Sequence, residues 1–264
     1  MTIVHPTALV AEGARLGHDV SVGPYCLVGP DVELDENVRL VSHVVIEGHT
    51  RLAAGCTVYP FASIGHQPQD QKYDGEVTSL QVGERTCIRE HVTMSPGTSG
   101  GGGKTIVGSD CLFMVASHLG HDCQVGNNVV LANNATVGGH VVIGDHAVLG
   151  GLSAVHQHVR IGPQAMVGGM SGVEHDVIPY GLVTGNRANL QGLNLVGLKR
   201  RNVPRDSILA LREAYEYLFA EIDTLKQRTR DLKLDLTSDP YVSTLVNFLN
   251  SESSRSICVP ARAS

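Results

Sequence analysis

The stretch "VGSDCLFMVASHLGHDCQVGNNVVLANNATVGGHVVIGDHAVLG", residues 107–150, carries an apolar residue at every sixth position. The period runs on to Val173, and earlier in the chain it covers Val4 to Ile64 and Val82 to Met94. A period of six fits neither an α-helix nor a simple two-residue alternation, but it fits short strands separated by turns. Glycine follows the apolar position in 13 of 26 repeats, so we expect glycine or asparagine to supply positive φ in the turns.

The repeat predicts an all-β solenoid whose stacked coils bury a thin column of aliphatic side chains. Such an interior explains why only 4% of the 264 residues are aromatic. We expect the solenoid to span residues 1–185, with inserted loops near 65–81 and 99–106. Residues 186–264 predict an α-helical C-terminal domain, because 207–227 has apolar residues at helical spacing and a second helix can start near Pro240. This domain would cover the strand edges of the last coil.

Composition and charge exclude several classes of protein. The chain has 20 basic and 26 acidic residues, which gives no sign of nucleic-acid binding. The N-terminus lacks a basic region followed by an apolar run, and no window is long enough to span a membrane. The six cysteines form no CxxC pair. We therefore expect a cytoplasmic protein with reduced thiols and no membrane span.

Histidines gather within the uninterrupted part of the repeat. Residues 18 apart stack on successive coils there, about 4.8 Å from each other. This predicts two adjacent columns: His121, Gly139 and Gln157 in one, and Asp122, His140 and His158 in the other. Histidine ordinarily titrates near neutrality, so His121 could take a proton from an alcohol and return it to a leaving thiolate. The N–H of Gly139 could donate to a developing oxyanion. These are the requirements of acyl transfer from a thioester to a hydroxyl.

Other readings of the histidines remain open on the residues alone. His118, His121 and His140 could bind zinc, as in β-helix hydratases that use three histidines. The histidines could also be solvated turn residues of a solenoid that serves only structure or binding. Two insertions in a strict repeat argue against that third reading, because long loops in compact domains are mostly functional.

Several segments go beyond the generic repeat: "PQDQKY" (68–73), "IRE" (88–90), "HLGHDCQVGN" (118–127), "LANNATVGGHV" (131–141), "AVHQH" (154–158), "VGGMSG" (167–172) and "GLNLVGLKRR" (192–201). In these segments the chain resembles the UDP-N-acetylglucosamine O-acyltransferases, which are hexapeptide-repeat acyltransferases. The resemblance implies a left-handed parallel β-helix and a homotrimer with each cleft between two solenoids. It also implies transfer of an (R)-3-hydroxyacyl chain from acyl carrier protein to the 3-hydroxyl of UDP-N-acetylglucosamine, the first step of lipid A biosynthesis. No cofactor or metal is implied.

The resemblance also implies roles for single residues. His121 is the general base, Asp122 orients or tunes it, and the Gly139 N–H is the oxyanion donor. The substrate-binding residues are Gln69, Asp70 and Lys72 for the sugar nucleotide, His118, His140, His156 and Gln157 along the cleft, and Asn194, Arg200 and Arg201 for the nucleotide or phosphates. The basic cluster at the end of "GLNLVGLKRR", which includes Arg200 and Arg201, could instead pair with the acidic carrier protein. Gly169 lies where the family gauges acyl length, so we expect a long chain, which neighbouring Met170 could shorten.

The chain departs from the family at two places. Ser95-Pro96 replaces a frequent His-Arg pair, and Val196 replaces a frequent glutamate. These departures leave open whether the acceptor is UDP-N-acetylglucosamine or its 3-amino analogue. The related N-acyltransferase of the same pathway carries an extra N-terminal domain, and we disfavour it because the repeat here begins at Val4.

Overall fold

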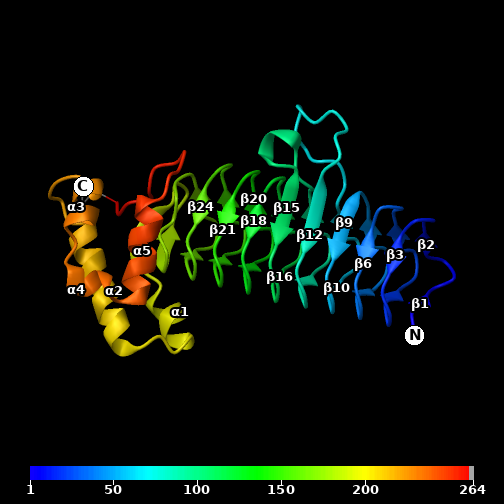
Figure 1. The fold of residues 1–264 in the computed structure, drawn as a ribbon, viewed down its shortest axis with the longest axis horizontal. Coiled ribbons are helices and arrows are strands. Elements are labelled where there is room, and N and C mark those ends of the chain that lie inside the picture. Colours follow the sequence, from blue (N-terminus) through cyan, green and yellow to red (C-terminus); the bar gives the residue numbers. More distant parts are fainter. Residues whose placement is uncertain (262–264) are drawn as a thin grey trace.

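The computed structural model describes residues 1–261, apart from the side chain of residue 234. The chain winds into a β-helix in which each coil contributes one short strand to each of three sheets (Figure 1). Sheet A contains β1 (Ile3–Val4), β4 (Ser21–Val22), β7 (Arg39–Leu40), β10 (Thr57–Val58), β13 (Cys87–Ile88), β16 (Leu112–Phe113), β19 (Val130–Leu131), β22 (Val148–Leu149), β25 (Met166–Val167), β27 (Gly181–Thr184) and β28 (Asn189–Leu193).

Sheet B contains β2 (Leu9–Val10), β5 (Leu27–Val28), β8 (Val45–Ile46), β11 (Ser63–Ile64), β14 (Thr93–Met94), β17 (His118–Leu119), β20 (Thr136–Val137), β23 (Ala154–Val155) and β26 (Gly172–Val173). Sheet C contains β3 (Arg15–Leu16), β6 (Glu33–Leu34), β9 (His49–Leu52), β12 (Ser79–Val82), β15 (Lys104–Val107), β18 (Gln124–Val125), β21 (Val142–Ile143) and β24 (Arg160–Ile161). All neighbouring strands pair in parallel except β27 and β28. The predicted β-solenoid is confirmed.

The register of the strands follows the period of six. His118 pairs with Thr136, and Thr136 with Ala154, so residues 18 apart do stack on successive coils. From β4 onward the second residue of each two-residue strand is buried, and Ile46, Leu119 and Leu131 are fully buried in the central column. Burying each such side chain contributes about 1.5–3 kcal/mol before entropy is counted. The aliphatic period therefore builds both the coil and its core.

The turns differ from the prediction in how they use glycine. Most positive-φ turn positions hold other residues, for example Tyr25, Phe61 and His140, at φ values of 57°, 65° and 60°. The glycine after each inward residue has another function, because a Cβ there would meet the next coil. At Gly23 a Cβ would lie 1.8 Å from the carbonyl oxygen of Val41. At most of these positions glycine permits close approach between coils; Gly65, with a φ of 81°, is the exception that takes the left-handed conformation.

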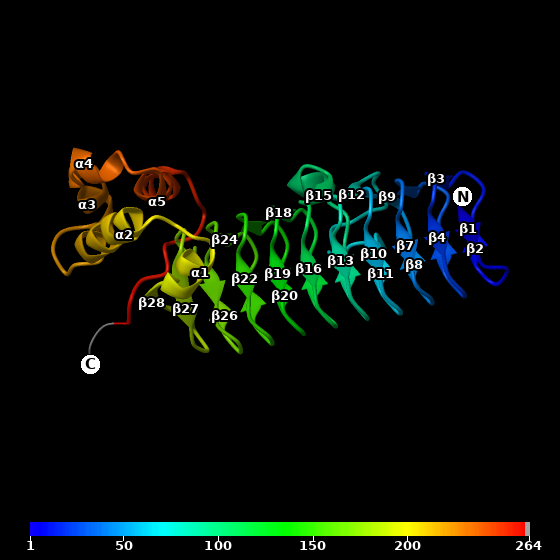
Figure 2. The ribbon, with the colours of Figure 1, turned by 90° about the horizontal axis from the view of Figure 1, so that it is seen from below.

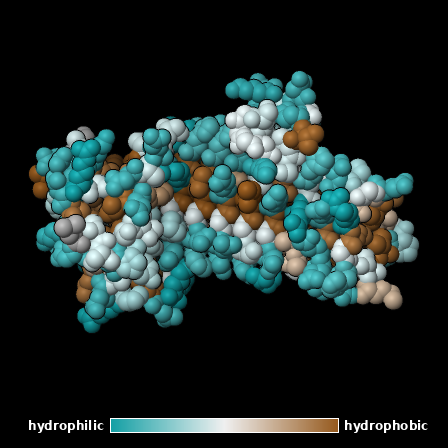
Figure 3. Space-filling model, viewed as in Figure 1, coloured by the Kyte–Doolittle hydropathy of each residue, from teal (hydrophilic) through white to brown (hydrophobic). Residues whose placement is uncertain are grey.

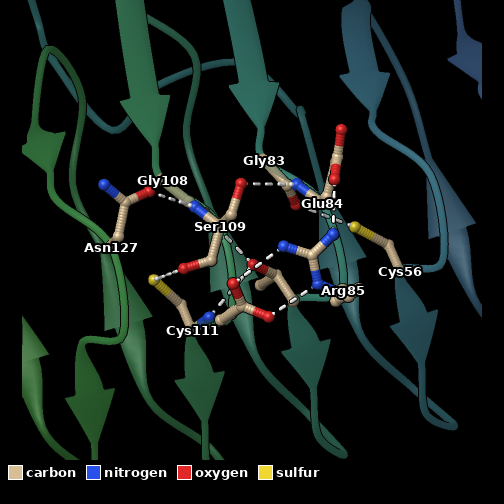
Figure 4. Close-up of polar contacts among 10 residues, drawn as sticks. Cys56, Gly83, Glu84, Arg85, Gly108, Ser109, Cys111 and Asn127 are labelled. Carbon is tan, nitrogen blue, oxygen red and sulfur yellow. Dashed lines mark hydrogen bonds and ion pairs between the residues drawn. The ribbon is translucent and has the colours of Figure 1, made fainter.

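Each coil has three corners, which we name by the sheets that they join. The C–A corner carries a ladder of side chain to backbone hydrogen bonds between coils (Figure 4). The Ser109 hydroxyl accepts from Glu84 N at 3.0 Å, and Asn127 Oδ1 accepts from Ser109 N at 2.9 Å. Arg85 also pairs with Asp110, with 2.8 Å from Nε to Oδ1. The bonds to Glu84 N and Ser109 N satisfy backbone groups at the turns, which the strands leave unpaired.

Both interruptions of the repeat lie at the B–C corner. The first follows β11 and ends at β12, and the second follows β14, contains the 3₁₀ helix η1 (Ser99–Gly101) and ends at β15. They project side by side from the middle of the solenoid (Figure 1). The B–C corner is therefore the one that departs from plain coil geometry.

The C-terminal part is helical and lies beyond the last coil (Figure 2). Its helices are α1 (Leu195–Arg200), α2 (Arg205–Leu218), α3 (Leu225–Asp231), α4 (Leu234–Thr237) and α5 (Pro240–Asn250). The helical spacing predicted over 207–227 is broken, because Asp223 takes a φ of 53° and Arg228 Nε donates to Leu218 O at 2.7 Å. Ile222 is consequently exposed. The helix predicted near Pro240 is confirmed as α5.

The end of the β-helix is covered by two segments. Strand β28 pairs antiparallel with β27, and residues 256–259 return to bond the last coil. Asp176 N donates to Ser256 O at 2.9 Å, and Leu190 N donates to Val259 O at 3.0 Å. No helix in the described residues is long and apolar enough to cross a membrane.

Candidate active site

The B–C corner brings the predicted histidine columns together. His140 N donates to His121 O at 2.8 Å, and His158 N donates to Gly139 O at 3.1 Å, so three successive turns are fixed in register. Asp122 and His140 have left-handed backbone, with φ of 59° and 60°. The imidazole rings of His140 and His158 stack in parallel at 4.4 Å, and His121 meets His140 edge to face at 4.9 Å.

His121 and Asp122 form a buried pair. Nδ1 of His121 lies 2.8 Å from Oδ2 of Asp122, and the two residues are 7% and 5% exposed. An ionised carboxylate can only accept, so Nδ1 carries the proton in neutral His121 and Nε2 has the free lone pair. Nε2 is therefore the atom that can take a proton from a substrate.

Asp122 is held by residues that the sequence did not single out. Thr98 donates to it twice, from N to Oδ1 at 2.8 Å and from Oγ1 to Oδ2 at 2.6 Å. The Oγ1 of Thr105 accepts from Asp122 N at 2.8 Å. Thr98 lies in the second insertion, and the only signal for it was the break in the repeat.

Gly139 lies directly against the ring of His121. A Cβ at residue 139 would be 2.6 Å from both Cε1 and Nε2 of His121, so only glycine fits. Gly139 is buried, and no acceptor for its N–H occurs among residues 1–261. The predicted base and the predicted oxyanion donor are thus neighbours in space.

Burial shifts the titration of two further histidines. Desolvation lowers the pKa of His118, and His121 nearby adds to that shift. Desolvation also lowers the pKa of His140, although the charge of Asp122 opposes the shift. The carboxylate of Asp70 also opposes the lowering of the His140 pKa, more weakly than Asp122 does. Both rings therefore favour the neutral form, which can donate or accept hydrogen bonds.

One group of side chains could hold a metal ion. Ligand atoms of His121, Asp122 and His140 lie within 4.8 Å of one another. His118, which the zinc reading required, is not in this group, and its Nδ1 instead lies 2.7 Å from Oγ1 of Thr93. The geometry therefore differs from a three-histidine zinc site.

The first insertion presents the predicted sugar-nucleotide residues. Gln69 and Lys72 are exposed and Asp70 is half-buried. Asp70 shapes the loop, because its Oδ1 accepts from Lys72 N at 3.0 Å and its carbonyl accepts from Tyr73 N at 3.1 Å. The loop thus offers a cation and an amide to solvent.

His156 and Gln157 lie at the B–C corner, one coil after Gly139 and His140. Both are exposed. They contact a residue that sequence reasoning missed, Arg255. Its guanidinium donates to His156 Nδ1 at 2.6 Å and to Gln157 O at 3.1 Å. No local signal could have found this pair, because 99 positions separate Arg255 from His156.

Other predicted residues lie elsewhere within one chain. Asn194 caps α1, accepting from Gly197 N and donating to Gln164 O, both at 3.0 Å. Arg201 donates to His146 O at 3.2 Å, and Arg200 is exposed on α1. Gln164 and His146 belong to the C–A corner, across sheet C from His121. A single chain does not bring the basic cluster to the histidines.

Gly169 also lies apart, at the A–B corner, across sheet B from the histidine columns. Gly169 is exposed, and Met170 beside it is 75% exposed.

The two departures from the family pattern differ in position. Ser95 and Pro96 are buried at the start of the second insertion, whereas Val196 is exposed on α1.

Comparisons with known proteins find relatives that match nearly the whole chain. A family model described as Udp N-acetylglucosamine O-acyltransferase, domain 2, matches residues 176–258, and one described as bacterial transferase hexapeptide matches 104–139. The acyl-[acyl-carrier-protein]–UDP-N-acetylglucosamine O-acyltransferase of Azorhizobium caulinodans is 52% identical, covering 99% of this chain and 97% of that protein. The protein of the same name from Caulobacter vibrioides is 51% identical, with 98% of each covered. The solved structure of LpxA from Acinetobacter baumannii matches with a TM-score of 0.94 at 39% identity, covering 97% of this chain and 99% of that one.

Proposed function

The chain belongs to the family of acyl-[acyl-carrier-protein]–UDP-N-acetylglucosamine O-acyltransferases, and we propose that it transfers an (R)-3-hydroxyacyl chain to the sugar's 3-hydroxyl with His121 as general base. Acyl carrier protein is the donor and UDP-N-acetylglucosamine the acceptor, and the reaction belongs to lipid A biosynthesis. The observation that carries the residue assignment is the His121–Asp122 hydrogen bond of 2.8 Å, which leaves Nε2 free beside Gly139.

The proton and the acyl group move in two steps. Nε2 of His121 takes the proton of the 3-hydroxyl while the oxygen attacks the thioester carbonyl, and the Gly139 N–H donates to the oxyanion that forms. The tetrahedral intermediate then breaks its C–S bond, and imidazolium returns the proton to the leaving thiolate. Asp122 stabilises that imidazolium and keeps Nε2 pointed outward. The products are the ester and the free thiol of the carrier protein.

The remaining polar residues are proposed to bind substrates. Asp70 and Lys72, with Gln69, would contact the sugar nucleotide, since their loop is hydrogen-bonded to the insertion that holds Asp122. His118, His156 and Gln157 would line the cleft. Exposed Gly169 leaves room for a long acyl chain that crosses the outer face of sheet B toward the A–B corner.

We propose that the active unit is a homotrimer whose clefts form between two chains. Within one chain, sheet C separates the histidine columns from α1, which ends at Arg200 and is followed by Arg201. Ile106 and Val142 are each 41% exposed on sheet C, and Figure 3 shows an apolar band along the middle of the solenoid. A second copy packed on that band would bring its α1, with Asn194, toward the first copy's B–C corner. Cyclic contacts of this kind close a ring.

The assay that tests the function uses purified protein, (R)-3-hydroxyacyl carrier proteins of several lengths and UDP-N-acetylglucosamine, with mass spectrometry of the products. We expect an O-acylated sugar nucleotide and a preference for long chains. A parallel reaction with the 3-amino analogue tests the acceptor, because preferential amide formation would contradict the assignment of the 3-hydroxyl. Hydratase activity that depends on stoichiometric zinc, without acyl transfer, would contradict the whole proposal.

A further inference from the structure

We propose that the second insertion of the β-helix is a device that fixes the carboxylate of Asp122, with Thr98 as its positioning residue. The inference rests on the proposed function, because Asp122 is the partner of His121 in that reaction. Thr98 has no hydrogen bond to the imidazole of His121 in the described residues, so we assign its effect on chemistry to Asp122.

The carboxylate has a donor for each oxygen. Thr98 N donates to Oδ1 at 2.8 Å, and Thr98 Oγ1 donates to Oδ2 at 2.6 Å. Oδ2 also accepts from His121 Nδ1 at 2.8 Å. A carboxylate held at both oxygens cannot rotate about its Cβ–Cγ bond without losing hydrogen bonds that are charged and buried. Such bonds are about twice as strong as neutral ones.

The backbone of the second insertion packs directly against the carboxylate of Asp122. A Cβ on Gly101 would lie 2.0 Å from Asp122 Cγ, so the η1 turn can cover Asp122 only with glycine there. On the other side, Thr105 Oγ1 accepts from Asp122 N at 2.8 Å. The side chain of Asp122 is fully buried as a result, which excludes water that would compete for its oxygens.

The insertion is itself anchored to the loop that carries Asp70 and Lys72. Glu76 Oε1 accepts from Ser99 N at 3.0 Å, and its Oε2 accepts from Asp74 N at 2.8 Å. Gly97 N donates to Ser79 O at 3.3 Å, which ties the two insertions at their bases. The proposed sugar-nucleotide loop and the holder of Asp122 therefore form one continuous unit.

Three variants test the inference in the full-length protein. Thr98→Val keeps the shape and the backbone N–H but removes the hydroxyl donor, whereas Thr98→Ser keeps that donor. Thr86→Val is the matched control, because Thr86 is a fully buried threonine whose Oγ1 donates to Gly108 O at 3.1 Å on the C–A corner. Initial rates of acyl transfer give kcat and KM for UDP-N-acetylglucosamine, and thermal melting reports folding.

We expect Thr98→Val to lower kcat by about 10- to 100-fold, the scale of a misplaced catalytic group, with KM changed less than about twofold. Thr98→Ser should restore kcat to within about threefold of wild type. Thr86→Val should lower the melting temperature but leave kcat unchanged. Wild-type kcat in Thr98→Val, no rescue by serine, or an equal loss in Thr86→Val would each overturn the inference. An inactive wild type would overturn the proposed function as well, so the two failures are distinguishable.

Discussion

The imidazole of His121 is held between a carboxylate and a glycine, and each neighbour limits what the site tolerates. Asp122 sets the tautomer through the 2.8 Å bond to Nδ1, while Gly139 sets the position of Nε2 through contact. A general base must lie within hydrogen-bond reach of the proton that it removes. The residue at position 139 therefore controls both the proposed donor N–H and the placement of the proposed base.

Gly139→Ala should abolish most activity without unfolding the protein. Its Cβ would lie 2.6 Å from Nε2 of His121, so the ring must move. A displacement of about 1 Å costs on the order of 100-fold in rate. Gly138→Ala is a control at the adjacent position, where a Cβ would first meet Gln157 at 3.0 Å rather than His121. Equal kcat values for the two variants would contradict the role of Gly139.

Acidification should destabilise the protein through His118. Burial lowers the pKa of His118 in the folded chain below the ordinary 6.5, so the unfolded chain binds its proton more readily. The corresponding stability is complete above pH 6.5 and is lost as pH falls through the lower folded value. Thermal melting between pH 8 and pH 5 should show a larger loss for wild type than for His118→Gln. Parallel curves would show that His118 does not contribute.

At the scale of single elements, the join between the β-helix and the C-terminal segment depends on a buried ion pair. Asp176 is fully buried and accepts from Arg160 Nε at 2.7 Å, and its backbone bonds Ser256 and Cys258. The guanidinium of Arg160 also lies 4.4 Å from the ring of Phe248 in α5. This pair therefore connects β24, the last B–C corner and the helical part.

Asp176→Ala should destabilise the protein by about 3 kcal/mol, because it leaves Arg160 without its buried partner. The matched control is Glu174→Ala, which removes an exposed partner of Arg187 and should lower the free energy of unfolding far less, because surface ion pairs contribute little. Urea unfolding, followed by circular dichroism, measures both. Similar losses for the two variants would show that burial of the Arg160 pair does not strengthen it.

The elements also show which features could be predicted from the sequence. The period of six predicted the stacking of His121, Gly139 and Gln157, because strand register in a solenoid depends only on repeat length. The break of the helix after Leu218 was missed, since it depends on Arg228 and Asp223 rather than on apolar spacing. Thr98 and Arg255 were missed because an insertion and a returning terminus have no period from which contacts could be derived.

At the scale of the whole molecule, the two proposed halves of the site lie on opposite edges of sheet C within one chain. Mixing subunits tests whether two chains share each cleft. His121→Ala chains and Arg200→Ala/Arg201→Ala chains, each nearly inactive alone, should regain activity when refolded together. Random mixing gives mixed trimers with one intact cleft in three, so we expect about a quarter of wild-type activity. Activity no greater than the sum of the separate variants would place both halves in one chain.

The most direct test of the B–C corner as the catalytic centre is the rate of acyl transfer by His121→Ala, measured with saturating UDP-N-acetylglucosamine and acyl carrier protein. Removing a general base costs about 10²- to 10⁴-fold, and we expect kcat to fall within that range while the melting temperature stays near that of wild type. A variant that retains kcat within about tenfold of wild type would show that the proton is removed elsewhere.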